Sequence, residues 1–493
     1  MDRRLLSLSA ALLAAGCAQL PPAPVGAVAS VPLDGSGYPV QVCDANYAGV
    51  AAQCTISGDG PFQLLRGNVI SDGKLYVGGT LLISPEGKVA TAGCAMPRVA
   101  ARIIDCPGAL VSAGLLNLHE HIDYSYQQPP APPTLKWVHR HEWRKLLPAQ
   151  RGFEGDAPKD PVVRTEVSER AMLRHMLTGS TAISGAKDYR AFLRNLKLAD
   201  GALATPTKPV IDSTFPLNDA GSMQWPSAPC TPEQVAQIKV AADKPFIPHV
   251  GEGTNAGAGY EVDCVLDAVK AKPTANAFIH GVAISEAQIA RLKAQDVAVV
   301  LSPRSNFRLY GATAPLPQLK AAGVTLAMGT DWSPSGSLSQ LDEARCLMRY
   351  NRDKLADLFS WADVHAMMTS NGARAVGLQG QIGKLAPGEW ADVVMIDTEG
   401  RRDLGAVLAN TALKQTLAVM VGGRFASYPT AWGEAVPRLD RCASDPRDLC
   451  GQQRTVCGAA AERSLGQLLK QPVYTINESS LCAPASTEDC VVR

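Results

Sequence analysis

The strongest constraint on the fold is a long region, from Leu110 to about Gly377, in which short apolar segments alternate with amphipathic ones. Apolar segments that predict β-strands lie at 109–118, 181–185, 209–213, 245–250, 277–280, 297–301 and 324–328. Segments that predict helices lie between them, for example at 163–177, 285–293 and 338–350. This alternation is typical of a parallel βα architecture. Because the region is roughly 270 residues long, it predicts a TIM-like (β/α)8 barrel of the α/β class, and we expect the eighth strand between Thr181 and His249.

The segments on either side of the barrel region are rich in short β-type runs. Turns such as Asp72-Gly73 interrupt these runs in residues 62–108, and β character returns in residues 380–432. We expect both flanks to form one small β-sandwich-like domain, with the barrel at 109–379. The remaining parts are a signal at 1–17, a tether with cysteines at 18–61, and a Cys-rich tail at 433–493 that is predicted to be loop.

Residues 1–17 have the pattern of a bacterial export signal. Arg3 and Arg4 precede an apolar stretch at 5–15, which is too short to span a bilayer as a stable helix. The stretch ends in Leu13-Ala14-Ala15-Gly16-Cys17, which resembles the lipobox of bacterial lipoproteins, although Ala14 stands where that motif usually has Leu. The resemblance implies lipidation of Cys17 and a membrane-anchored protein of the cell envelope, on its periplasmic or surface face. An ordinary cleaved signal is the alternative.

The cysteine and charge counts limit the compartment and the partners. Of 13 cysteines, an even number remains once Cys17 is set aside, and none forms a Cys-x-x-Cys pair. Close pairs such as Cys43/Cys54 and Cys94/Cys106, and the cluster at 442–490, predict disulfides and an oxidising compartment, but the sequence leaves their connectivity open. With 47 basic and 46 acidic residues, the chain lacks the positive footprint of a nucleic-acid-binding protein. We therefore expect a small-molecule substrate as the partner besides the membrane.

Two histidines with a spacing of two follow the first apolar strand, in Leu118-His119-Glu120-His121. In a strand, alternate side chains lie on the same face, so both imidazoles can bind one metal ion at the carboxyl end of a barrel strand. A second pair, His139 and His141, lies in a predicted helix, where this spacing separates the side chains. We expect that pair at the surface or in a pocket wall. Three further strands end in a polar residue: His249, His280 and Asp331.

These pieces, in this order, resemble the amidohydrolase superfamily, especially its branch of aminohydrolases and chlorohydrolases that act on nitrogen heterocycles. The similar segments are Cys106-Pro107-Gly108-Ala109-Leu110-Val111 before the two histidines, His249-Val250-Gly251-Glu252, Ser302-Pro303-Arg304-Ser305-Asn306, Gly329-Thr330-Asp331, and Gly383 to Asp392. The similarity runs from about Leu64 to Asp397. The chain departs from the pattern at Ser302, where the branch often has Cys, and in the short region before His249.

The resemblance implies a role for each residue of the site. His119, His121, His249 and Asp331 would bind one divalent ion, Zn²⁺ or alternatively Fe²⁺, which lowers the pKa of its water to about 7. Asp331 would also accept a proton from that water, and Glu252 would carry a proton to the leaving nitrogen. His280 would orient or polarise the reacting atom, and Asn306 would contact the substrate. The implied function is hydrolysis of a non-peptide carbon–nitrogen bond, by deamination or by cyclic amide hydrolysis.

Two other functions stay open at this point. Binuclear members of the superfamily, such as dipeptidase-like enzymes, bridge two metal ions with a carboxylated lysine, and Lys187 is the candidate for that bridge. Since Lys187 follows what resembles the second strand rather than the fourth, a solvated lysine is the favoured interpretation. A metal-free binding or scaffold protein is the non-enzymatic alternative, although a scaffold has no need of five polar groups at one barrel mouth.

Overall fold

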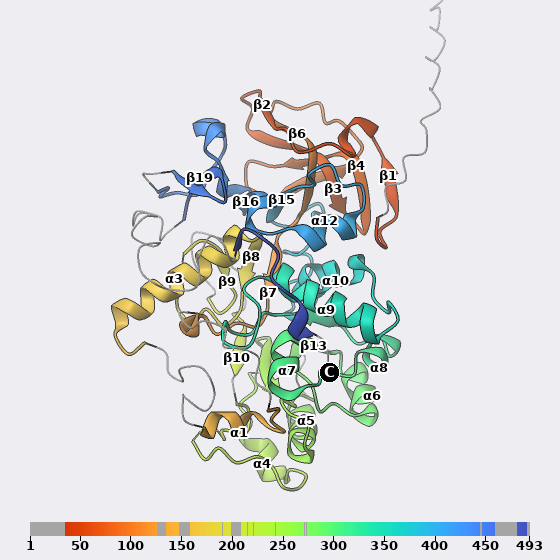
Figure 1. Ribbon diagram of the computed structural model, residues 1–493, viewed down its shortest axis with the longest axis vertical. Helices are drawn as coiled ribbons and strands as arrows, with labels where there is room; N and C mark the ends of the chain where they lie inside the picture. The colour runs from red at the N-terminus through yellow and green to blue at the C-terminus, as the bar shows by residue number, and fades with distance from the viewer. Residues whose placement is uncertain are drawn as a thin grey trace, which may run out of the picture. The chain divides into compact units, whose positions relative to one another are not determined.

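The computed structural model describes residues 35–125, 135–146, 158–189, 191–198, 209–213, 215–219, 221–241, 243–270, 272, 274–443, 446–458 and 481–490. The predicted signal and Cys17 lie outside these residues. The described part forms one compact unit. It contains a parallel barrel and, packed on it, a larger mixed sheet (Figure 1).

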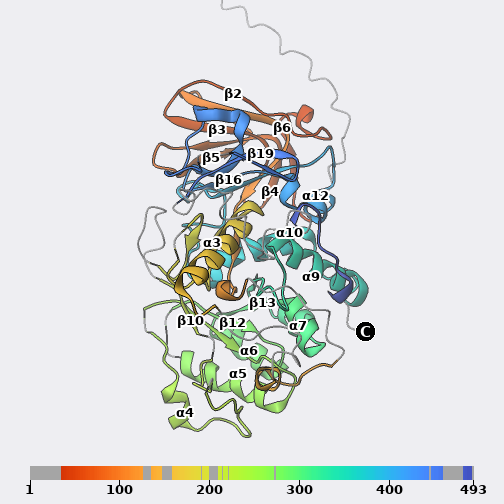
Figure 2. The ribbon, with the colours of Figure 1, turned by 60° about the vertical axis from the view of Figure 1, so that its left-hand side comes forward.

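The barrel is built from two parallel sheets that follow each other along the chain (Figure 2). The first consists of β7 (Leu115–Asn117), β8 (Ser180–Ile183) and β9 (Arg194–Asn195). The second consists of β10 (Ile211–Ser213), β11 (Phe246–Val250), β12 (Asn276–His280), β13 (Val297–Leu301) and β14 (Leu326–Met328). Backbone hydrogen bonds join them at both junctions, from Val210 to Leu196 and from Asp331 to His119, each 2.8 Å long. The predicted (β/α)8 arrangement is therefore present.

The eighth strand is β9, which lies between Thr181 and His249 as expected. It has two residues, Arg194 and Asn195, and both are polar and buried. A search for apolar runs cannot find such a strand, because its polar side chains are satisfied by buried partners rather than by water. Arg194, for example, makes a two-bond ion pair with Asp392, at 2.7 and 2.8 Å.

The strand predicted at 109–118 is two strands, and this corrects the first boundary of the barrel. Strand β6 (Ala101–Ala113) belongs to the large sheet and pairs there with β15 (Val393–Asp397). The chain changes sheets at Gly114, where a Cβ atom would lie 2.2 Å from the Thr181 side chain. Only glycine fits at this crossing. The apolar sequence continues through it without interruption, because both strands are buried.

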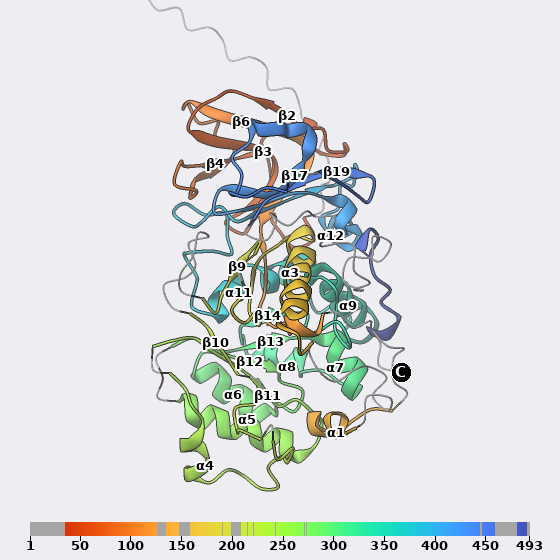
Figure 3. The same cartoon turned by 90° about the vertical axis from the view of Figure 1, so that its left-hand side faces the viewer.

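The large sheet combines segments from both sides of the barrel (Figure 3). Its N-terminal strands are β1 (Val40–Val42), β2 (Thr55–Ser57), β3 (Phe62–Ser71), β4 (Lys74–Ile83), β5 (Val89–Gly93) and β6. Its C-terminal strands are β15, β16 (Thr416–Val421), β17 (Arg424–Pro429), β18 (Arg447–Leu449) and β19 (Gln452–Val456). The antiparallel pair β6–β15 joins the two halves, so the predicted composite β-domain exists. It is larger than expected, because segment 18–61 contributes β1 and β2 and the tail contributes β18 and β19.

The described helices lie between the strands of the barrel and in the segments that follow its last strand, β14. They are α1 (Arg140–Lys145), α3 (Pro161–Leu177), α4 (Pro232–Gln237), α5 (Ala256–Val269), α6 (Glu286–Ala294), α7 (Pro303–Tyr310), α8 (Leu316–Ala321), α9 (Gln340–Lys354), α10 (Trp361–Met368), α11 (Ser370–Ala375) and α12 (Leu404–Asn410). The start of α6 shows why these helices begin where they do. Ser285 and Gln288 form a capping box that satisfies backbone N–H groups of the first turn. None of the described helices is both long and apolar enough to cross a bilayer.

The inside of the barrel is filled with small and aliphatic side chains, including Leu116, Ala182, Ile247, Ala277, Ile279, Ala298, Val300 and Ala327. The barrel is therefore a packed core rather than a pore. Polar residues are placed where this packing ends, at the carboxyl ends of the strands.

The 12 cysteines of the described residues are paired in six disulfides. The pairs are Cys43–Cys94, Cys54–Cys106, Cys230–Cys264, Cys346–Cys490, Cys442–Cys457 and Cys450–Cys482. The expected disulfides Cys43/Cys54 and Cys94/Cys106 are wrong, because strand pairing brings together cysteines that are distant in sequence. Thr55 of β2 pairs with Asp105 of β6, and this register places Cys54 beside Cys106.

Candidate metal centre

The predicted ligand residues meet at one end of the barrel. His119 and His121 follow β7, His249 lies in β11, His280 ends β12, and Asp331 follows β14. Because all these strands are parallel, their carboxyl ends open on the same side. The side chains of His119, His249, His280 and Asp331 are almost completely buried, and His121 is one quarter exposed.

The distances between the donor atoms test whether these residues fit a metal ion. The Nε2 atoms of His119, His121 and His249 lie 3.0, 3.1 and 3.3 Å from one another. Asp331 Oδ1 lies 3.3 Å from His119 Nε2 and 3.5 Å from His121 Nε2. Ligands at 2.0–2.1 Å from a tetrahedral zinc ion would be about 3.3 Å apart. The three histidines, and Asp331 with His119 and His121, therefore have donor spacings that fit a tetrahedral metal site.

The partner of His119 fixes which ring nitrogen faces the other donors. Ser302 Oγ donates a hydrogen bond to the Gly329 carbonyl at 3.0 Å, so it can accept one from His119 Nδ1 at 2.8 Å. The Nδ1 atom then carries the proton, and Nε2 keeps the lone pair that metal binding requires. Gly329 makes this close packing possible, since a Cβ there would lie 2.5 Å from the His119 backbone nitrogen.

Electrostatics at the centre favour uncharged imidazoles and a bound cation. Burial, followed by the neighbouring histidines, holds the pKa of His119 well below its ordinary value. Burial also raises the pKa of Asp331 well above its usual range, and nearby carboxylates such as Glu252 add to the shift. Neutral imidazole nitrogens 3 Å apart repel through their lone pairs, and a divalent cation between them would relieve this repulsion. The donor set thus fits a metal ion chemically as well as geometrically.

His280 and Glu252 lie beside the four donors. His280 Nε2 is 3.7 Å from Glu252 Oε1, and a ring nitrogen of His280 lies within 4.8 Å of nitrogens of His119 and His249. Burial lowers the pKa of His280 to about 3, so this imidazole is neutral at pH 7. Burial raises the pKa of Glu252, against the opposing effects of Arg140 and a hydrogen bond from Tyr310. Glu252 is therefore better able than an exposed glutamate to hold a proton.

Two of these residues have a strained backbone. His280 and Asp331 have φ angles of 71° and 63°, in the left-handed region that side chains with a Cβ rarely adopt. Such a conformation costs about 1–3 kcal/mol and persists where the surrounding structure enforces it. His280 is the last residue of β12 and Asp331 follows β14, so in both cases the unusual conformation occurs where a strand gives way to a loop at the site.

One short helix contacts four groups of the site, and the sequence analysis did not foresee this. Ser302, which precedes α7, contacts His119, and Ser305 Oγ donates to Asp331 Oδ2 at 2.6 Å. Asn306 Oδ1 lies 2.9 Å from His280 Nδ1, and Tyr310 OH donates to Glu252 Oε1 at 2.6 Å. A spacing of three or four residues along this segment is the available signal, because it places the four side chains on one helix face.

Asn306 was predicted to contact the substrate, and that role is untested. Its side chain is fully buried, and its amide nitrogen donates to Thr313 Oγ1 at 3.2 Å. The amide oxygen accepts from His280 Nδ1, which leaves His280 Nε2 with its lone pair facing the site. In this arrangement Asn306 orients His280.

A buried ion-pair cluster supports the two histidines after β7. Glu120, which lies between them, is 3.1 Å from His175 Nε2 and 3.7 Å from Arg174. It also accepts a hydrogen bond from Thr330. All of these side chains are buried, so the cluster fixes the backbone from which His119 and His121 project.

The other sequence candidates lie elsewhere. His139 is the N-cap of α1 rather than a helical residue, and its ring lies 4.9 Å from that of His141. Both are buried rather than at the surface, and His141 Nε2 is 2.7 Å from Asp219. Lys187 contacts Asp123, its side chain is 52% exposed, and it belongs to neither of the described groups with metal-ligand spacing.

Aromatic side chains stand around the mouth of the site. Trp332 lies 6.2 Å from His121 between ring centres, and it packs against Trp143 and Tyr124 at 5.4 Å each. Phe215 approaches His249 from another direction, at 6.4 Å. These rings can contact a flat substrate from more than one side.

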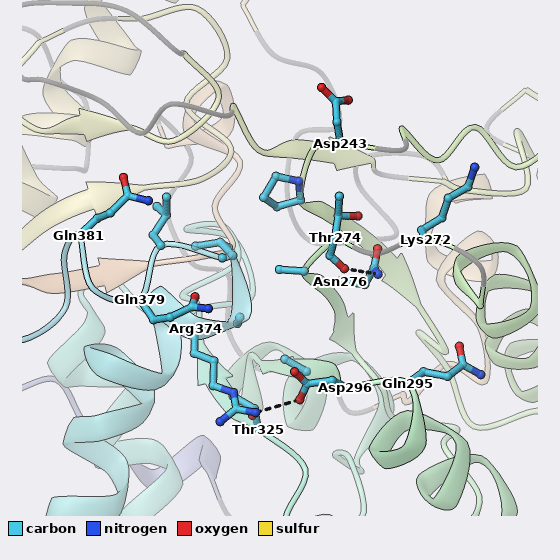
Figure 4. Close-up of a pocket in the computed structure, with 17 residues that line it drawn as sticks. Asp243, Lys272, Thr274, Asn276, Gln295, Asp296, Thr325, Arg374, Gln379 and Gln381 are labelled. Carbon is cyan, nitrogen blue, oxygen red and sulfur yellow. Dashed lines mark hydrogen bonds and ion pairs between the residues drawn. The ribbon is translucent and has the colours of Figure 1, made fainter.

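Two cavities lined by described residues lie at different ends of the barrel. A cavity of about 80 Å³ adjoins His119, His121 and His249 and is also lined by Lys187 and Asp212. A larger one, of about 560 Å³, lies at the opposite end of the barrel (Figure 4). It is bordered by residues that begin strands, such as Asn276, and none of the predicted site residues lines it. Barrel enzymes place their chemistry at the carboxyl ends of the strands, so the larger cavity is not the candidate site.

Comparison with known proteins adds to this geometry. Residues 217–426 match the model of the amidohydrolase family. The chain is 27% identical over 390 residues to a 5-methylthioadenosine/S-adenosylhomocysteine deaminase of Syntrophobacter fumaroxidans, covering 68% of this chain and 84% of that protein. It is 24% identical over 402 residues to an 8-oxoguanine deaminase of Pseudomonas aeruginosa, covering 69% and 88%. An adenosine deaminase of Xanthomonas campestris, solved with bound zinc, has a similar fold, with a TM-score of 0.54 at 18% identity over 74% of this chain and 92% of that one.

Proposed function

We propose that this chain, which matches the amidohydrolase family over residues 217–426, is a metal-dependent hydrolase of that superfamily that deaminates a nitrogen heterocycle. The reaction cleaves a carbon–nitrogen bond outside a peptide, in a small molecule. Deamination is favoured over cyclic amide hydrolysis because both relatives described above are named as deaminases.

The observation that carries the proposal is a cluster of four donors, three of them buried, with spacings that fit a tetrahedral metal site and with a buried acid beside them. His119, His121, His249 and Asp331 would hold one divalent ion, Zn²⁺ or alternatively Fe²⁺. When bound, such an ion activates water by lowering its pKa to about 7.

The protein's own groups would move the protons. Asp331 Oδ2 is held by Ser305, which leaves Oδ1 to face the other donors and to accept a proton from the attacking water. Glu252 would deliver a proton to the leaving nitrogen, since an amine is a poor leaving group until it is protonated. Tyr310 holds the Glu252 carboxyl in place. His280 would act as a hydrogen-bond acceptor at Nε2 and orient an N–H or O–H group of the reactants.

A single ion is favoured over the binuclear, dipeptidase-like alternative. Lys187 would have to bridge two ions, but its side chain instead contacts Asp123 at the edge of the cavity. The metal-free scaffold alternative leaves the buried and otherwise repulsive cluster of imidazoles without a purpose.

Export and a lipid anchor on Cys17 are part of the proposal. Support comes from the signal-like pattern of residues 1–17 and from the six disulfides, which form in oxidising compartments.

The experiment that tests the function compares Glu252→Gln and His249→Ala with the wild type. Release of ammonia is measured from aminated purines, with cyclic amides and dipeptides as alternative substrates, and metal content is measured on the same samples. Glu252→Gln should keep the metal and lose turnover by about a hundredfold or more, because the amide cannot deliver the proton. His249→Ala should lose metal and activity together.

The matched control is Glu286→Gln, an exposed position at the start of α6, which should leave both quantities unchanged. Near-normal turnover in Glu252→Gln would contradict the deaminase mechanism. Two ions per chain, one of them lost in Lys187→Ala, would favour the binuclear alternative.

A further inference from the structure

Two opposite faces of helix α7 make polar contacts with the rest of the protein, and only one of these faces points into the candidate active site. The inner face carries Ser305, Asn306 and Tyr310, whose contacts with Asp331, His280 and Glu252 are described above. The outer face carries Arg304, Phe307 and Arg308, which follow the same helical spacing on the opposite side. This outer face is covered by residues 481–490, the C-terminal segment, which lies beside α7 and α9 (Figures 1 and 3).

Polar contacts fix the C-terminal segment to α7. Arg304 Nη1 lies 2.6 Å from Asp489 Oδ1, and Arg304 Nη2 donates to the Ser486 carbonyl at 3.0 Å. Arg308 Nε is 3.7 Å from the other oxygen of Asp489. Both guanidinium groups are more than nine-tenths buried, so the Asp489 carboxylate balances two positive charges that are largely shielded from water.

A disulfide fixes the same segment covalently. Cys490 is bonded to Cys346 of α9 across a sequence separation of 144 residues, and both cysteines pack against Phe307. The backbone N–H of Ala485 also donates to Asp342 of α9 at 3.1 Å. The segment is therefore attached to α7 on one side and to α9 on the other.

Helix α7 depends on such contacts because it is short. It has eight residues, and a helix of two turns is not stable on its own. Its N-cap residue, Ser302, makes no capping hydrogen bond, and the Arg304 backbone N–H of the first turn donates instead to Glu343 Oε1 of α9 at 2.8 Å. The helix ends at Gly311, which has a left-handed conformation. Its position is thus set by what packs on its two faces. A displacement of the helix would move the partners of His119, Asp331, His280 and Glu252 together.

We propose that the C-terminal segment is part of the catalytic apparatus, with Asp489 and Cys490 as positioning residues that act on the site through helix α7. Its kinetic effect rests on the proposed function, whereas its structural effect does not. Loss of the Asp489 contacts would misalign Asp331 and Glu252, which move protons, and His280, which orients the reacting group. The aromatic side chains at the mouth, such as Trp332 and Phe215, are not part of α7 and would stay in place. A misplacement of about 1 Å can lower turnover by about a hundredfold.

The test uses the full-length protein with Asp489→Ala, Asp489→Asn and Cys490→Ser. The matched controls are Glu488→Ala, an exposed neighbour, and Cys482→Ser, which removes a different disulfide of the same tail. For each protein we would measure kcat and KM, hydrogen exchange of residues 303–310, and the visible spectrum of the Co²⁺-loaded site.

Asp489→Ala should lower kcat by about tenfold or more with less than a twofold change in KM, accelerate exchange in α7 and alter the Co²⁺ spectrum. Asp489→Asn keeps an oxygen that can accept from Arg304, so it should recover part of kcat. Cys490→Ser should resemble Asp489→Ala. Should Cys490→Ser not fold, the two Asp489 variants decide the matter.

Faster exchange in α7 with unchanged kcat and spectrum would overturn the proposal, because the segment would then stabilise the helix without positioning the site. Equal losses in Glu488→Ala or Cys482→Ser would also overturn it. If the wild type deaminates no substrate, the proposed function fails, and the Co²⁺ spectrum and the exchange of α7 still decide whether the segment positions the site.

Discussion

His365 of α10 is a buried histidine outside the metal centre that connects two parts of the molecule. Its Nδ1 lies 2.7 Å from Tyr38 OH, and its Nε2 lies 2.7 Å from Ser112 Oγ of β6. Burial lowers its pKa to about 4. Between pH 6.5 and 4 the unfolded chain therefore binds a proton at this residue that the folded chain does not bind. The contribution of His365 to stability is complete above pH 6.5 and is lost as the pH falls towards 4.

We expect His365→Asn to weaken the loss of stability in acid. In the wild type this residue should account for about 3 kcal/mol of the fall in the free energy of unfolding between pH 6.5 and pH 4. The variant should be less stable at pH 7, because it loses packing, but its stability should fall less as the pH drops. Urea unfolding at several pH values measures both slopes. Parallel slopes for the two proteins would contradict this assignment.

Individual residues also differ in whether the sequence alone can mark them as part of the candidate site. His119, His121, His249, His280 and Asp331 stood out because they follow apolar strands. Ser302 and Ser305 are chemically ordinary, and only the packing of α7 against the strand ends brings their hydroxyl groups to His119 and Asp331. Hydrogen bonds between side chains that are distant in sequence leave no local pattern.

Among the strands, β9 shows how a polar element can hold two parts of the fold together. Arg194 of β9 makes a two-bond ion pair with Asp392, which precedes β15 of the large sheet. The same carboxylate accepts from the Gly422 backbone N–H at 2.8 Å, in the turn between β16 and β17. Both charged side chains are buried, so each depends on the other for compensation.

We expect Asp392→Asn to lower the free energy of unfolding by about 3–5 kcal/mol, because it removes the charge of the carboxylate that pairs with the buried Arg194 guanidinium. Asp296→Asn is the matched control, since the Asp296–Arg374 pair is mostly exposed and should contribute about 0–1 kcal/mol. Chemical unfolding of both variants measures the difference. Similar losses in the two variants would show that burial does not set the strength of the Arg194 pair.

At the scale of the whole molecule, disulfides connect segments that are far apart in the sequence. The disulfides Cys43–Cys94 and Cys54–Cys106 lie within the N-terminal half of the large sheet, and Cys346–Cys490 ties the end of the chain to the barrel. Such links persist in an oxidising compartment, as an exported protein would require.

Lipid anchoring is tested by metabolic labelling with a fatty acid in a bacterial host. The wild type should carry the label and sediment with membranes, whereas Cys17→Ala should lose both properties, because the other cysteines are engaged in disulfides. A Cys17→Ala protein that still carries the label would contradict the anchor. An unlabelled, soluble wild type would favour an ordinary cleaved signal.

The sequence by itself determined the class of fold and which polar residues meet at one end of the barrel. Alternating strand and helix patterns are local, and burial imposes them on the barrel strands other than β9, so seven of the strands could be predicted along the chain. The candidate ligands could be predicted because a parallel barrel brings the carboxyl ends of its strands together, so residues at those ends lie close to one another.

Only the tertiary structure decided where the chain passes from the large sheet into the barrel and which contacts support the site. Gly114 separates two buried strands whose apolar sequences are continuous, and the polar β9 carries no hydrophobic signal. The disulfide pairs followed strand register rather than distance along the chain. The link from the C-terminal segment through α7 to the catalytic groups depends on contacts between residues far apart in sequence. Such contacts form only when the chain has packed, because each local segment is compatible with many partners.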